Sequence, residues 1–91
     1  MDIALEKTVV ITNQRGLHAR AAAKFVRLVE QLKADITVTK DDMSVTGSSI
    51  MGLLMLSASL HTQIRIVAKG PHAAQALQAL VSLIERRFDE E

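Results

Sequence analysis

The sequence predicts an α+β open-faced sandwich, in which a four-stranded antiparallel sheet carries three helices on one face. Alternating segments and segments with helical spacing follow one another in the order βαββαβα. The expected strands present apolar residues to one side and many threonines to the other, so one face of the sheet should be partly wetted. The 91 residues contain no linker or repeat, and we expect one domain over residues 1–91.

The first half of the chain is expected to hold a strand and a long helix. Lys7 to Thr12 alternates, with Val9 and Ile11 on one face. Leu17 to Lys33 is typical of an amphipathic helix. Its predicted buried stripe consists of Ala22, Phe25, Val29 and Leu32, and its polar stripe consists of Arg20, Lys24, Arg27 and Gln31.

The second half is expected to add a hairpin, a short helix, a strand and a last helix. The hairpin joins Asp35–Lys40 to Met43–Thr46 through two aspartates. A short helix is predicted from Ser48 to Leu56, and Gln63–Lys69 alternates as the fourth strand. The last helix has Pro71 in its first turn, and its apolar stripe reaches the acidic tail through Ala73, Leu77, Leu80, Ile84 and Phe88.

The start of the first helix carries charges of unusual sign. Helix starts favour carboxylates, because the first turn has the positive end of the dipole and unpaired N–H groups. Arg15, His18 and Arg20 lie there instead, and the sequence has no carboxylate between Thr8 and Val29. This pattern favours an anion at the site, and phosphate is the anion that suits a helix start best.

The segment Gly16-Leu17-His18-Ala19-Arg20-Ala21-Ala22 resembles the active-site motif of HPr, the histidine-containing phosphocarrier proteins of the bacterial phosphoenolpyruvate-dependent phosphotransferase system. The resemblance covers nearly the whole chain and includes Ser49-Ile50-Met51-Gly52. The end, Arg87-Phe88-Asp89-Glu90-Glu91, is similar to that of the nitrogen-related branch, NPr. Many members have proline where this chain has Ala21, which keeps the helix start but loses the rigidity of proline.

His18 is the predicted phosphoryl acceptor. The dipole of a helix start disfavours a charged imidazole and leaves a ring with a nucleophilic lone pair. The backbone amides of Ala19 and Arg20, together with the Arg20 guanidinium, are expected to bind the phosphoryl oxygens. The resemblance implies that the δ1 nitrogen is used and that the group is passed onward. The resemblance also implies two partners, enzyme I as donor and an enzyme IIA-type protein as acceptor.

Further residues are predicted to contact partners or to regulate. Basic residues of the first helix and apolar residues of the short helix form the expected docking surface, namely Lys24, Arg27, Ile50, Met51 and Leu54. Leu53 and Leu56 are expected in the core. Two interpretations of Ser49 stay open: it is a helix N-cap, or it is the target of an HPr-type serine kinase, as in some relatives. Ser48 is expected to be an ordinary cap.

Composition argues against several other classes of function. A net charge of +1 and two aromatic residues are atypical of nucleic-acid binding. His61 and His72 lack partners at metal-ligand spacing, so we expect surface histidines and no metal or cofactor. There is no cysteine, basic leader or apolar run of membrane length, from which we expect a cytoplasmic protein without membrane contact. We also expect a monomer. No catalytic dyad is visible, so the chain is expected to be a substrate of other enzymes.

One alternative comes from another class of protein. A small regulatory α+β domain would bind an anionic metabolite at the Arg15–Arg20 helix start. A nucleic-acid-binding module is a third hypothesis. Both are disfavoured by His18, because anion binding needs donors and has no special use for a nucleophile. The choice between the sugar branch and the nitrogen branch stays open.

Overall fold

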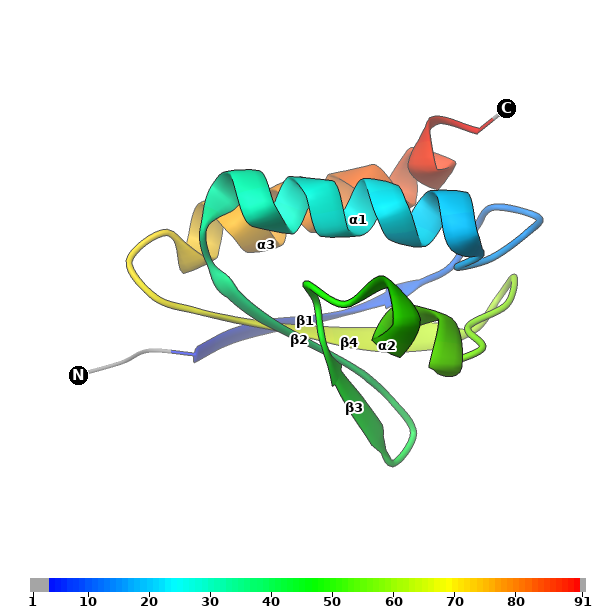
Figure 1. Ribbon diagram of the computed structural model, residues 1–91, viewed down its shortest axis with the longest axis horizontal. Coiled ribbons are helices and arrows are strands. Elements are labelled where there is room, and N and C mark those ends of the chain that lie inside the picture. Colours follow the sequence, from blue (N-terminus) through cyan, green and yellow to red (C-terminus); the bar gives the residue numbers. More distant parts are fainter. Residues whose placement is uncertain (1–3, 91) are drawn as a thin grey trace.

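Four antiparallel strands form one sheet, and their order across it is β1-β4-β2-β3 (Figure 1). The computed structural model describes residues 4–90. Along the chain the elements are β1 (Ala4–Val10), α1 (Ala19–Leu32), β2 (Asp35–Lys40), β3 (Met43–Thr46), α2 (Ile50–Met55), β4 (Gln63–Lys69), α3 (Ala73–Glu85) and the 3-10 turn η1 (Arg87–Asp89). The predicted order βαββαβα is confirmed, as are the bounds of β2, β3 and β4.

The core lies between the sheet and the layer formed by α1 and α3. Figure 1 shows these two helices side by side over one face of the sheet, with α2 near β3. Apolar side chains that alternate along β4 and β2 meet the helices, and all of them are buried: Ile64, Ile66, Ala68, Ile36 and Val38. On the other face Thr8 is exposed and Thr37 and Thr39 are half-buried, as the alternation predicts.

The first strand starts and ends earlier than the alternation predicted. It covers Ala4–Val10 instead of Lys7 to Thr12, because β4 pairs with it from Ala4↔Lys69 to Val10↔Gln63. Ile11 lies beyond the strand but stays buried, and its amide donates to the Thr62 carbonyl at 2.9 Å. Tertiary pairing therefore overrides the weak local pattern at this edge.

Helix α1 is one to two residues shorter at each end than predicted. It ends at Leu32, where Lys33 takes a left-handed backbone (φ 53°) and its amide donates to the Val29 carbonyl. Ala22, Phe25 and Val29 are buried as predicted, whereas Leu32 is only half-buried. Ala21 is fully buried, so the alanine in place of proline serves the core as well as the helix start.

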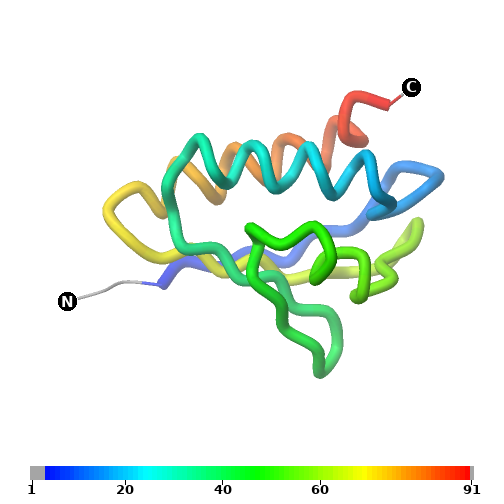
Figure 2. The backbone as a smooth tube through the Cα atoms, viewed as in Figure 1, coloured from blue at the N-terminus to red at the C-terminus, as the bar shows by residue number. Residues whose placement is uncertain are grey.

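The predicted continuation of α3 to Phe88 is wrong. The helix begins at Ala73, two residues after Pro71, and ends at Glu85. Arg87, Phe88 and Asp89 then all have positive φ angles, of 59°, 55° and 58°. Such backbone costs a non-glycine residue about 1–2 kcal/mol, and here it turns the chain back so that Phe88 is fully buried. Figure 2 shows this red segment over the blue-to-cyan start of α1.

Of the helices between residues 4 and 90, none is long and apolar enough to span a membrane.

Candidate functional site

The loop before α1 is fixed by the loop that follows α2. Gly16 has a φ of 66°, and a Cβ at this position would lie 2.5 Å from the carbonyl oxygen of Ala58. Only glycine fits this close approach of two backbones. The amide of Leu17, which is itself buried, donates to the same carbonyl at 2.8 Å. His18 therefore follows a rigid segment of chain.

His18 caps helix α1 with its own side chain. The Arg20 amide donates to His18 Nδ1 at 3.3 Å, and the Ala22 amide makes the first helical bond to the His18 carbonyl at 2.8 Å. The amides of Ala19, Arg20 and Ala21 precede that bond, so they belong to the helix end whose N–H groups lack helical partners. The predicted phosphate-binding amides thus lie beside the ring, on its Nδ1 side.

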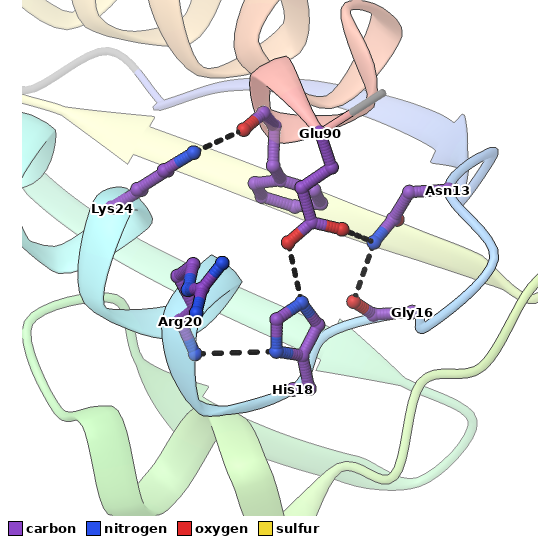
Figure 3. A network of polar contacts seen from close by, with 7 residues as sticks. Asn13, Gly16, His18, Arg20, Lys24 and Glu90 are labelled. Carbon is purple, nitrogen blue, oxygen red and sulfur yellow. Dashed lines mark hydrogen bonds and ion pairs between the residues drawn. The ribbon is translucent and has the colours of Figure 1, made fainter.

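A carboxylate lies on the other ring nitrogen, which the local sequence did not indicate. Glu90 Oε2 is 2.5 Å from His18 Nε2, and the two side chains are 18% and 22% exposed. The other oxygen, Oε1, accepts from Asn13 Nδ2 at 3.0 Å, and the same nitrogen donates to the Gly16 carbonyl at 2.8 Å. Figure 3 shows this chain of contacts. The segment from Thr8 to Val29 contains no carboxylate, and in the fold one reaches the helix start from 72 residues away.

The network assigns the protons of the ring. Nδ1 accepts from an amide and so carries no proton, which makes Nε2 the donor to Glu90. Burial alone would raise the pKa of Glu90, but hydrogen bonds from Asn13 and His18 and the charge of Lys24 lower it below the ordinary glutamate value. Glu90 is therefore an ionised acceptor at neutral pH.

Two contacts hold the tail that carries Glu90. Phe88 is fully buried in the core. Lys24 Nζ donates to the Phe88 carbonyl at 2.6 Å, and the lysine is half-buried. The sequence placed Lys24 on a polar docking stripe and did not indicate this structural contact. Arg27 is exposed, as that prediction requires, and the docking role of both residues stays a prediction.

The side chains of Arg15 and Arg20 are not held in place by other described residues. Both are exposed, and within residues 4–90 neither guanidinium makes a hydrogen bond or ion pair. Arg15 and Arg87 line a hollow of about 360 Å³ that Glu90 also lines. The Glu90 carboxylate offsets part of the positive charge of the two arginines there, which weakens the case for a bound anionic metabolite. Arg20, in the first turn of α1, stays available to a group on Nδ1.

The short helix α2 presents apolar side chains to solvent, as predicted. Met51 is 69% exposed and Ile50 is 41% exposed, while Leu53 and Leu56 are buried. Leu54 was expected at the surface with Met51, but it is half-buried against the core. Met55, at 61% exposed, takes its place in the surface patch. The error is one residue in the rotation of a six-residue helix, whose apolar pattern is too short to fix its orientation.

The cap of α2 is Ser49, and the prediction for Ser48 is wrong. Ser49 Oγ accepts from the Gly52 amide at 2.9 Å. Ser48 Oγ lies 3.1 Å from the Thr46 hydroxyl instead. The N-cap interpretation of Ser49 is thus confirmed, whereas its phosphorylation stays a prediction.

The remaining histidines lie at the surface. His61 and His72 are both exposed, as expected. Over residues 4–90, His, Cys, Asp and Glu side chains nowhere gather in threes as metal ligands would.

Comparison with known proteins places the chain in a family. Residues 5–86 match the family model described as the PTS HPr component phosphorylation site. The phosphocarrier protein HPr of Neisseria meningitidis serogroup B is 44% identical over 86 residues, which cover 94% of this chain and 97% of that protein. The chain belongs to the HPr family. It is a phosphocarrier of a phosphotransferase system, and HPr membership implies enzyme I and enzyme IIA proteins as partners.

Other members of the HPr family are similar in sequence and in fold. The phosphocarrier protein NPr of Shewanella violacea is 40% identical, and the match covers 94% of each chain. HPr-C-His of Thermoanaerobacter tengcongensis has a TM-score of 0.91 at 41% identity, with 96% of this chain and 98% of that chain covered. HPr of Bacillus anthracis has a TM-score of 0.86 at 36% identity, with 89% and 96% covered. The predicted α+β HPr-like sandwich is therefore confirmed.

Proposed function

We propose that His18 is the residue that carries the phosphoryl group, on its Nδ1 atom. The observation that carries this proposal is the placement of Nδ1 at the start of α1, 3.3 Å from the Arg20 amide, while Nε2 is occupied by Glu90. Nδ1 has the lone pair and faces helix-end amides, which are suited to phosphoryl oxygens. The other ring nitrogen, Nε2, is hydrogen-bonded to Glu90.

The transfer moves one phosphoryl group between two imidazoles. The lone pair of His18 Nδ1 forms a P–N bond while the P–N bond to the enzyme I histidine breaks and its electron pair returns to that ring. Onward transfer reverses these roles with the enzyme IIA-type acceptor. The amides of Ala19 and Arg20 and the Arg20 guanidinium stabilise the charge on the equatorial oxygens, so catalysis rests on positioning and charge. The chain is not an independent catalyst.

Partner docking is assigned to the surface beside His18. Exposed Ile50 and Met51 supply an adaptable apolar patch, and exposed Arg27 adds positive charge from α1. We place the protein in the cytoplasm and in the nitrogen-related branch. The NPr relative and the acidic end of the chain support that branch.

Phosphorylation by purified donors tests the proposal. The protein is incubated with phosphoenolpyruvate and either a sugar-type or a nitrogen-type enzyme I. We expect one acid-labile, base-stable phosphoryl group, faster labelling by the nitrogen-type donor, and no labelling of His18→Ala. His61→Ala and His72→Ala serve as matched controls and should label normally, since both residues are exposed. Labelling that persists in His18→Ala contradicts the assignment, and faster labelling by the sugar-type donor contradicts the branch.

A further inference from the structure

The C-terminal turn is built so that Glu90 has a fixed place on the His18 ring. Three successive residues, Arg87 to Asp89, have left-handed backbone, which persists only where the surroundings enforce it. Phe88 is fully buried between them. Glu90 contacts Nε2, the ring nitrogen opposite the proposed acceptor atom Nδ1.

We propose that Glu90 is a positioning residue that keeps the proton of His18 on Nε2 and thereby keeps Nδ1 as the nucleophile. This proposal rests on the proposed acceptor role of His18. Glu90 contacts the ring on the nitrogen opposite Nδ1, and it acts through the ring.

The hydrogen bonds around Glu90 fix which of its oxygens meets the ring. Asn13 is 2% exposed, and its Nδ2 is shared between Glu90 Oε1 at 3.0 Å and the Gly16 carbonyl at 2.8 Å. Oε1 is thereby tied to the loop before α1, and Oε2 points at Nε2 (Figure 3). An ionised carboxylate has only acceptors, so the proton between the two groups belongs to the ring. A carboxylate behind a histidine fixes its tautomer and orientation in the same way in other sites.

The same contact acts on the phosphorylated ring. When Nδ1 gains the phosphoryl group and Nε2 keeps its proton, the ring becomes cationic, and the Glu90 carboxylate stabilises that charge. When the Nδ1–P bond breaks, its electron pair returns to the ring and neutralises it, while the proton stays on Nε2. A protonated ring is the better leaving group, so Glu90 supports onward transfer without moving a proton.

Other charged groups around the ring act differently. Arg20 and Lys24 on α1, Arg15 on the preceding loop and Arg87 on the tail are cations, and they oppose a cationic ring. The remaining tail carboxylate, Asp89, pairs with Arg86 Nε at 2.9 Å. Among the described residues Glu90 is therefore the carboxylate that contacts the ring.

Two variants remove the charge of Glu90 and differ in the acceptors that they leave. Glu90→Gln keeps one oxygen for the two donors, Asn13 Nδ2 and His18 Nε2, whereas Glu90→Ala keeps none. Glu85→Gln is the matched control, because it removes an exposed carboxylate at the end of α3. The first readout is the tautomer ratio of His18 in the unphosphorylated full-length protein, from its ¹⁵N ring shifts at alkaline pH. The second is the pH profile of hydrolysis of the phosphorylated protein.

We expect the ratio of Nε2–H to Nδ1–H ring to fall about tenfold in Glu90→Ala, as loss of a charged hydrogen bond implies, and to fall less in Glu90→Gln, whose one oxygen can accept from either His18 Nε2 or Asn13 Nδ2. The midpoint of the hydrolysis profile should move to lower pH by about one unit in both Glu90 variants, because both lose the charge. Glu85→Gln should match the wild type in both readouts.

The proposal is overturned if either readout of Glu90→Ala equals the wild type, or if Glu85→Gln moves the profile as far as the Glu90 variants do. Absence of label from His18 would instead refute the proposed function. In that case the tautomer measurement, which needs no phosphoryl group, still decides whether Glu90 holds the ring.

Discussion

Replacement of Phe88 by alanine should release the tail from the core and from the site together. Phe88 is fully buried, and removal of a buried phenylalanine side chain costs about 3–5 kcal/mol. Release of Phe88 would also relieve the left-handed backbone of that one residue, which returns about 1–2 kcal/mol. We therefore expect the free energy of unfolding to fall by about 1–4 kcal/mol. Chemical denaturation followed by circular dichroism measures this loss, with the midpoint moving and the slope unchanged.

The same variant has a second readout at the site. Because Phe88 anchors the segment that carries Glu90, the ¹⁵N ring shifts of His18 should move toward those of Glu90→Ala. Arg87→Ala is the matched control, since it changes an exposed neighbour in the same turn and should alter stability by about 0.5 kcal/mol or less. A Phe88→Ala variant that loses under about 1 kcal/mol, or whose His18 shifts stay as in the wild type, would refute the idea that the buried ring holds Glu90 in place.

Three further predictions use the same assays. Arg20→Ala should slow phosphoryl transfer more than Lys24→Ala, and equal losses of rate would contradict a special role of Arg20. Lys24→Ala should instead lower the free energy of unfolding by about 1 kcal/mol, because it removes a hydrogen bond to the tail. Met51→Glu should slow phosphoryl exchange with both partners but change the free energy of unfolding by no more than about 0.5 kcal/mol, since the side chain is 69% exposed. A large loss of stability would place Met51 in the core. Because the pKa of Glu90 is lowered in the fold, its stabilising effect is present above the ordinary glutamate pKa and is lost as the pH falls through the lowered value. Glu90→Gln should therefore lose less stability than the wild type in urea titrations over about pH 6 to 2, and equal acid sensitivity would contradict the shift.

Most of the fold could be predicted from local pattern. Strands with clear alternation, such as Gln63–Lys69, were predicted to the residue, because a period of two depends on neighbours in sequence alone. The edge strand β1 was displaced, since its ends depend on pairing with β4. The exposure of Met51 was predicted, but that of Met55 was not, because a six-residue helix has too few apolar positions to fix its rotation.

Half of the site could be predicted from the sequence. A short motif predicts that His18 lies at a helix start, and in the structure His18 is the N-cap of α1. Glu90 lies 72 residues away and reaches the ring only through three left-handed residues. No propensity scale favours such a turn at Arg87, Phe88 and Asp89. The one available signal was a large apolar residue, Phe88, set between charged neighbours at the end of the chain.

The linkage of the phosphoryl group on His18 tests the proposed chemistry most directly. The ¹⁵N-labelled protein is phosphorylated by its enzyme I and observed by ³¹P and ¹⁵N NMR under alkaline conditions. We expect one-bond coupling between phosphorus and Nδ1 of His18, because Nδ1 faces the Arg20 amide and Nε2 faces Glu90. Coupling to Nε2, or a phosphate on a serine, would contradict it.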